Sequence, residues 1–122
     1  MPAIDPTIRM QDIHIRRGDT FRYRPDPFLD AAGDPINLTS YTFLAQVRAS
    51  ADAEAPLVAI TVTIIDATAG VLELSIPAGT TSSLDTVANA LAVYDAQWTT
   101  GGGDVKTFLA GNAFLYGDVA RA

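Results

Sequence analysis

The sequence predicts an all-β fold, an antiparallel sandwich of about eight short strands. Apolar and polar residues alternate along several segments, which is the period of a strand with one buried face. Clusters of Gly, Pro and Asp separate these segments and supply the backbone angles that turns need. With 122 residues, the chain has the size of one domain with one core.

The N-terminal residues differ from the rest. Residues 1–11 include Pro2 and Pro6 and show no sustained period, so we expect an extended arm there. Residues 12–122 are then expected to form the single sandwich domain. The arm has acids and prolines where a signal peptide needs a basic start and an apolar run, and no later stretch is long and apolar enough for a membrane span. We therefore expect a soluble protein.

The first strands show the alternation most clearly. In residues 12–16 the isoleucines face one way and the polar side chains the other, and Gly18 and Asp19 follow as a tight turn. Residues 20–24 alternate again until two prolines interrupt them. This pattern predicts a hairpin with its turn at Gly18-Asp19.

The remaining elements follow the same logic. The segment 30–35 is rich in turn residues and predicts a second hairpin that continues into residues 36–38. Further strands are expected at residues 41–48, 57–65, 71–76, 90–99 and 105–119, the last with a bend or bulge at Gly111. Hydroxyl-rich residues 80–89 predict a short helical crossover of one or two turns.

Composition excludes several functions. The formal net charge of -6 repels nucleic-acid backbones and anionic lipids, so neither nucleic acid nor membrane is an expected partner. The chain has no cysteine, which excludes disulfides, thiolate catalysis and thiolate metal sites. Its one histidine, His14, lies on the polar side of a strand, and no nucleophile and base can be assembled. We expect no enzyme activity, no catalytic residues and no cofactor.

Two other groups of residues are candidate sites. Asp26, Asp30 and Asp34 recur every four residues but do not match a calcium-loop spacing, so we interpret them as turn residues and expect no metal. Exposed aromatic residues could stack on sugars, with Tyr116, Trp98 and Phe28 as candidates. Trp98 shares its strand pattern with Tyr94, so core packing is the favoured interpretation for it.

Positive charge is concentrated in the first quarter of this acidic chain. The candidate interface residues are Arg9, Arg16, Arg22 and Arg24, with Arg17 nearby. They could form a solvated face, or a docking patch for an acidic partner, because guanidinium groups pair well with carboxylates. Both interpretations stay open at this point.

Three regions together resemble a known family. They read IRRGDTFRYR, then DAAGDPINLTSYTFLAQVR, then AGVLELSIPAGTTSSL followed by AVYDAQWTTGGGDVKTFLAGNAFLYGDVAR. They are similar to a small all-β protein of tailed phages and prophages, related to the N-terminal domain of upper baseplate proteins. The positions that carry the resemblance are Gly18, Asp19, Thr20, Gly33, Pro35, Leu38, Thr39, Val47, Arg48, Tyr94 and Asp95.

The resemblance implies an immunoglobulin-like sandwich that serves as a virion structural protein in the tail tip, baseplate or fibre-attachment region. It implies synthesis in the host cytoplasm, and assembly with other virion proteins and with copies of itself in a symmetric oligomer. No catalytic or ligand-binding residues come with the family. Two alternatives remain, a capsid decoration protein and a carbohydrate-binding module that recognises host surface glycans.

Overall fold

The computed structural model describes residues 8–50, 52–84 and 90–117 and is built almost entirely of β-strands. The described elements are β1 (Arg9–Met10), β2 (Ile13–Arg16), β3 (Phe21–Tyr23), β4 (Thr42–Arg48), β5 (Val58–Asp66), β6 (Val71–Ile76), the helix α1 (Ala78–Thr81), β7 (Ala90–Thr99) and β8 (Val105–Tyr116). The prediction of an all-β fold with little helix is confirmed. The predicted crossover helix is a single turn, and residues 85–89 of that segment lie outside the described residues.

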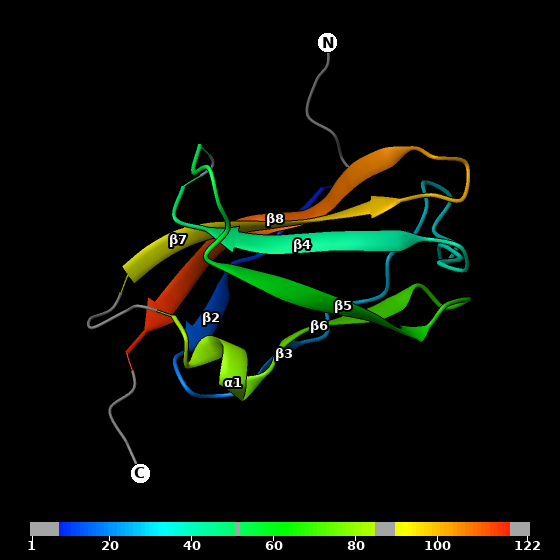
Figure 1. Ribbon diagram of the computed structural model, residues 1–122. Helices are drawn as coiled ribbons and strands as arrows, with labels where there is room; N and C mark the ends of the chain where they lie inside the picture. Colours follow the sequence, from blue (N-terminus) through cyan, green and yellow to red (C-terminus); the bar gives the residue numbers. More distant parts are fainter. Residues whose placement is uncertain (1–7, 51, 85–89, 118–122) are drawn as a thin grey trace.

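The strands form one continuous sheet that curls into a half-barrel (Figure 1). The order across it is β1-β8-β7-β4-β5-β6-β3, and β2 also pairs with β8. Strand β5 joins the two parts of the sheet, because Val58 and Ile60 lie in its pairing with β4 while the pairing with β6 begins at Thr61. The concave side of the sheet encloses the core, and the convex side is called the outer face below.

The predicted hairpin at Gly18-Asp19 is wrong. The turn exists, since the Asp19 N–H donates to the Arg16 carbonyl at 3.1 Å and Gly18 has a φ of 88°. Arg17, the other central residue, has no positive φ, so the turn is not of the primed type whose twist suits a hairpin. The strands therefore diverge: β3 pairs antiparallel with β6, and β2 pairs with β8.

The first strands run parallel to β8, so the expectation of a wholly antiparallel sheet is also wrong. Arg9 lies opposite Leu109 and Ile13 opposite Ala113, which is the same register for both strands. Together β1 and β2 are one edge strand with an interruption at residues 11–12. The sheet thus begins inside the predicted arm, and residues 1–7 lie outside the described residues.

The predicted second hairpin is reduced to a turn with one bridge, between Leu29 and Pro35. The backbone on either side bonds to the connection between β5 and β6 instead: the Phe28 N–H donates to the Gly70 carbonyl at 3.0 Å and the Leu38 N–H to the Ala67 carbonyl at 2.9 Å. Because these donors are used in this way, the segment crosses the end of the half-barrel, where it buries Phe28 and Leu38 while Leu29 stays exposed.

The sequence predicts a bend or bulge at Gly111 in the last strand. In the structure the bulge lies at Phe108. Ala96 pairs with Leu109 while Gln97 pairs with Thr107, so Phe108 is the extra residue on β8. The bulge lets both Phe108 and Leu109 point inward, and both are fully buried. Gly111 itself lies in regular pairing with Tyr94.

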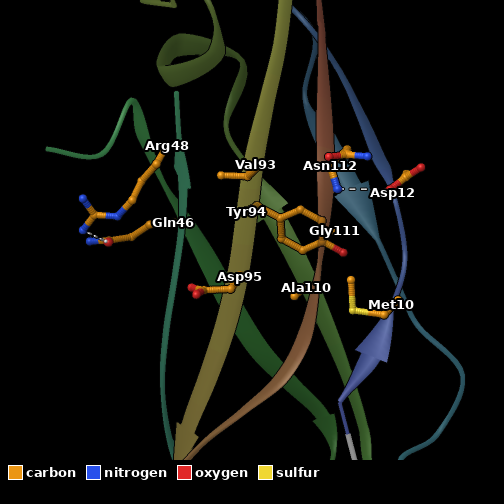
Figure 2. A pocket seen from close by; sticks show the side chains of 10 residues that line it. All are labelled: Met10, Asp12, Gln46, Arg48, Val93, Tyr94, Asp95, Ala110, Gly111 and Asn112. Atoms are coloured by element: carbon orange, nitrogen blue, oxygen red, sulfur yellow. Dashed lines mark hydrogen bonds between the residues drawn. The ribbon is translucent and has the colours of Figure 1, made fainter. Parts of the chain in front are cut away.

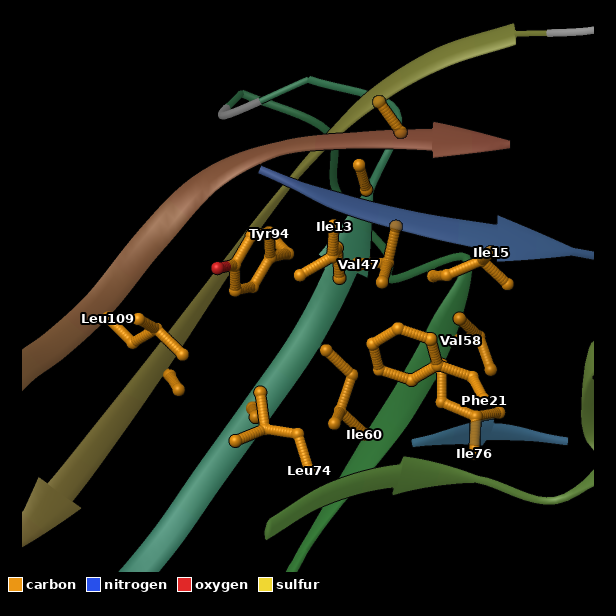
Figure 3. Packing of buried hydrophobic residues seen from close by; sticks show 14 of the residues in the cluster. Ile13, Ile15, Phe21, Val47, Val58, Ile60, Leu74, Ile76, Tyr94 and Leu109 are labelled. Carbon is orange, nitrogen blue, oxygen red and sulfur yellow. The ribbon is translucent and has the colours of Figure 1, made fainter. Parts of the chain in front are cut away.

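Aromatic side chains fill one end of the core. The rings of Trp98 and Phe108 stack at 4.5 Å between centroids, and Phe28 meets both edge-on at 5.7 and 5.2 Å. Mainly aliphatic side chains from β2, β4, β5, β6 and β8 pack in the rest, together with Phe21 and Tyr94 (Figure 3). The expectation that Trp98 packs in the core is confirmed.

The other end is closed by α1. The hydroxyl of Thr81, which is fully buried, accepts the Gly18 N–H at 3.1 Å and donates to the Asp19 carbonyl at 2.7 Å. One threonine thereby satisfies both the Gly18 N–H and the Asp19 carbonyl in the turn that leads from β2 to β3.

Candidate interaction surfaces

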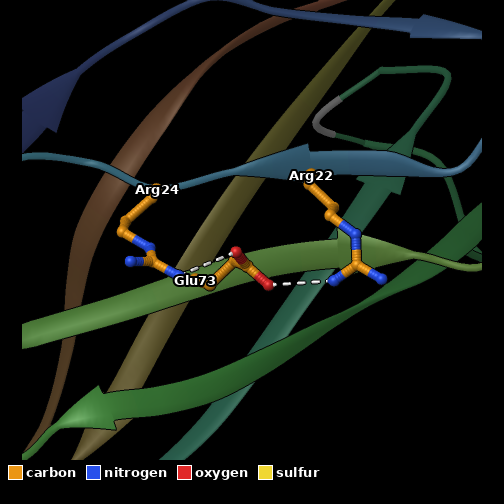
Figure 4. Close-up of polar contacts among 3 residues, drawn as sticks. All are labelled: Arg22, Arg24 and Glu73. Carbon is orange, nitrogen blue, oxygen red and sulfur yellow. Dashed lines mark hydrogen bonds and ion pairs between the residues drawn. The ribbon is translucent and has the colours of Figure 1, made fainter.

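Arg22 and Arg24 converge on one carboxylate (Figure 4). Arg22 lies on β3 and Arg24 just beyond its end, and both reach Glu73 on β6, with N–O distances of 3.2 and 3.4 Å. Both arginines are largely exposed, so each pair adds little stability, about 0–1 kcal/mol. Two guanidinium groups on one carboxylate leave one positive charge uncompensated on this part of an acidic protein.

Arg16 does not share a surface strand with those two arginines. It lies on β2, paired with β8 and not with β3, and its guanidinium stands over the Tyr116 ring at 5.3 Å. His14 stacks between Phe114 and Tyr116, with centroid distances of 5.1 and 5.8 Å, and its Nδ1 lies 2.8 Å from the Tyr116 hydroxyl. These residues form a stack along the β2–β8 edge.

Arg9 makes contacts within the fold. Its guanidinium donates to the carbonyls of Asp26 at 2.6 Å and Pro27 at 3.2 Å, and stands 4.2 Å from the centre of the Phe28 ring. It joins the edge strand to the segment that crosses the end of the half-barrel. Of the four candidate interface arginines, the structure brings only Arg22 and Arg24 together.

A shallow hollow of about 410 Å³ lies on the outer face over four neighbouring strands (Figure 2). Side chains cross it in rows because the strands are in register. One row runs from Arg48 on β4 to Val93 on β7 and Asn112 on β8, and the Asn112 N–H bonds the carboxylate of Asp12 at the edge. Arg48 is positioned by hydrogen bonds of 2.8 Å to the Gln46 side chain and the Ala53 carbonyl.

The sequence reasoning missed this hollow because its residues come from four separate segments. The sequence nevertheless carries a signal for the sheet face on which the hollow lies. Leu44 and Leu91 stand in the outward phase of their strands, where polar residues are expected, and they are 55 and 61 % exposed; Met10 on β1 is 70 % exposed. Exposed apolar side chains of this kind are candidates for contact with another molecule.

One side of the hollow is bounded by the junction at residues 11–12. The Tyr94 hydroxyl donates to the Gln11 carbonyl, and the Asp12 carboxylate accepts the Asn112 N–H at 3.0 Å, so side chains replace the missing ladder bonds. Burial raises the pKa of Tyr94 well above its usual value, and the nearby Tyr23 and Asp12 raise it further. Gly111 leaves room for this junction, since a Cβ there would lie 2.3 Å from the Gln11 carbonyl oxygen.

The candidate metal-binding aspartates have a structural explanation. Asp30 makes a turn, with its carboxylate accepting the N–H groups of Ala32 and Asp34 at 2.9 and 3.0 Å. Within residues 8–50, 52–84 and 90–117, no group of three His, Asp or Glu side chains is placed to hold a metal ion. In the same ranges no helix has the length and apolarity needed to cross a bilayer.

The proposed sugar-stacking aromatics are not a surface platform. Trp98 and Phe28 are buried, and Tyr116 is half-buried beneath Arg16 and beside His14.

Comparison with models of known protein families and with the sequences of curated proteins found no match. The resemblance to phage baseplate proteins therefore stays a prediction from the sequence.

Proposed function

We propose that this chain is a structural protein of a tailed-phage virion, located in the tail tip, baseplate or fibre-attachment region. It acts by assembly with copies of itself and with other virion proteins, and carries out no catalysis. The sequence resemblance supports the setting. The observation that supports assembly is the outer face, where Met10 lines a shallow hollow and where Leu44 on β4 and Leu91 on β7 stay largely exposed.

The immunoglobulin-like sandwich implied by the resemblance is part of this proposal. Its two layers correspond to the sheet on either side of β5, with β4, β7 and β8 in one layer and β6 and β3 in the other. A strand shared between layers makes a corner of the kind found in orthogonally packed sheets. The outer surface of each layer is then available for a different neighbour in the particle.

The direct test is to locate the protein in purified virions with a specific antibody and electron microscopy. Label at the tail tip or baseplate supports the proposal, whereas label over the capsid favours the decoration alternative. Absence of the protein from virions refutes both. A glycan array with the isolated protein tests the carbohydrate-binding alternative, for which Tyr116 is the remaining aromatic candidate.

A second test concerns the two arginines that share Glu73. If they dock an acidic neighbour, the double variant Arg22→Glu with Arg24→Glu should lower incorporation into virions, because like charges then face each other. The matched control is Glu73→Gln, which removes the shared carboxylate and should preserve or raise incorporation. Unchanged incorporation of the double variant would assign these arginines to a solvated face.

A further inference from the structure

The outer face carries opposite charges at the two ends of one row. Arg48 lies on β4, Asp12 lies at the edge beside β8, and β7 and β8 run between them with Val93 and Asn112 in the row. Three strand spacings of about 4.8 Å separate the two ends by about 14 Å. The two charges therefore cannot form an ion pair within one chain.

The row becomes self-complementary when a second copy is turned about a two-fold axis. If the axis runs parallel to the strands between β7 and β8, Arg48 of one copy lies opposite Asp12 of the second, and the symmetric pair forms as well. The neighbouring row follows the same rule. Leu91 on β7 is paired with Phe114 on β8. In the dimer, Leu91 of each copy therefore lies opposite Phe114 of the other copy.

We propose that the outer face of β4, β7, β8 and the β1–β2 edge is an isologous interface between two copies of this chain. Two ion pairs between Arg48 and Asp12 would flank two apolar contacts between Leu91 and Phe114. This inference names the partner for the assembly described above and in that sense rests on the proposed function.

Burial and positioning favour this occupant. Leu91 is 61 % exposed, and covering it is favourable by the hydrophobic effect. Arg48 is already held by Gln46 and the Ala53 carbonyl, so pairing costs it less side-chain entropy than a free arginine would lose. Asp95 faces the hollow. In the dimer, the 410 Å³ of the hollow leave room for water to hydrate the Asp95 carboxylate.

The experiment measures the monomer–dimer equilibrium of the purified full chain by sedimentation over a range of concentrations. The wild type should dimerise, and Arg48→Glu and Asp12→Lys should each weaken dimerisation at least about tenfold, because each creates two like-charge pairs. An equimolar mixture of these two variants should form a mixed dimer. In that dimer the two substituted side chains carry opposite charges and face each other on one side, and the native pair of Arg48 with Asp12 forms on the other.

Two further variants keep the result interpretable. Asp12→Lys removes the acceptor of the Asn112 N–H, so Leu91→Glu serves as a second probe; its side chain is exposed, it should fold normally, and it should also abolish dimerisation. The matched control is Arg22→Glu, the same charge change on β3 at the far end of the strand order, which should dimerise like the wild type.

A monomeric wild type, or dimers that persist in both Arg48→Glu and Leu91→Glu, would overturn the interface. So would folded charge variants that fail to associate when mixed. In each of these cases virion labelling still decides the proposed function separately, because a protein that is monomeric in solution can be present in the particle.

Discussion

Gly111 offers the sharpest test of how the first strand is held in the sheet. A Cβ at this position would lie 2.3 Å from the carbonyl oxygen of Gln11 and 2.8 Å from its carbonyl carbon, and neither backbone atom can move independently. Gly111→Ala should therefore push the junction at residues 11–12 away from β8. The predicted result is a loss of stability without a change in the rest of the core.

The size of the loss follows from the hydrogen bonds at the junction. Displacement would break the bond from the Gln11 N–H to the Ala110 carbonyl, the bond from Tyr94 to Gln11, and the bond from the Asn112 N–H to the Asp12 carboxylate. At about 1 kcal/mol each, these sum to about 3 kcal/mol. The reduced entropy of the unfolded alanine chain returns about 0.4–1 kcal/mol, so we expect a net loss of about 2–3 kcal/mol.

Urea unfolding followed by the fluorescence of Trp98, the only tryptophan in the chain, measures this quantity. The matched control is Gly79→Ala in α1, where a Cβ meets nothing within 4 Å and alanine favours the helix, so its stability should equal or exceed that of the wild type. A Gly111→Ala variant within about 0.5 kcal/mol of the wild type would refute the steric reasoning, because surface substitutions routinely stay inside that range.

Three further outcomes follow from buried groups. Thr81→Val should cost about 1–3 kcal/mol in the same urea assay, because it leaves the Gly18 N–H and the Asp19 carbonyl without their partner; an unchanged midpoint would contradict this. The raised pKa of Tyr94 means that the folded state holds this proton more tightly than the unfolded state does, so its contribution to stability is complete below about pH 10 and is lost as the pH rises above that. Tyr94→Phe should therefore show a shallower alkaline decline than the wild type, and equal slopes would argue against it. Trp98→Ala should cost about 3–5 kcal/mol when measured by circular dichroism, since it empties a buried aromatic stack; a loss below about 1 kcal/mol would mean that the stack contributes little.

Alternation in the sequence correctly assigns faces. Ile13 and Ile15 point inward as predicted, and the strand expected at 41–48 is observed at Thr42–Arg48. The alternation does not show which strand each one pairs with, because the same pattern fits any neighbouring strand that leaves one face buried. The turn at Arg17-Gly18 is not of the primed type, and the Gly-Asp pair in the sequence does not determine this.

The candidate surface was predicted only in part for a related reason. Sequence proximity suggested one patch of four arginines, but β2 and β3 belong to different pairings, so Arg16 and Arg22 lie on separate parts of the sheet. The sequence also does not show that backbone carbonyls accept the guanidinium of Arg9. The outer-face hollow combines residues from four segments, and the outward leucines Leu44 and Leu91 lie on the same face without lining it.

The parallel pairing of the first strand with β8 has a consequence for how the chain reaches its fold. Asp12 and the N–H that it accepts are 100 residues apart, and the strand pairing of β1 and β2 with β8 has the same range. Such contacts close the largest loops and form slowly. During synthesis, residues 9–16 emerge long before β8 exists, so they have no sheet partner until most of the domain has left the ribosome. The edge strand β1–β2, which is made before its partner β8, is therefore among the last to be placed in the sheet.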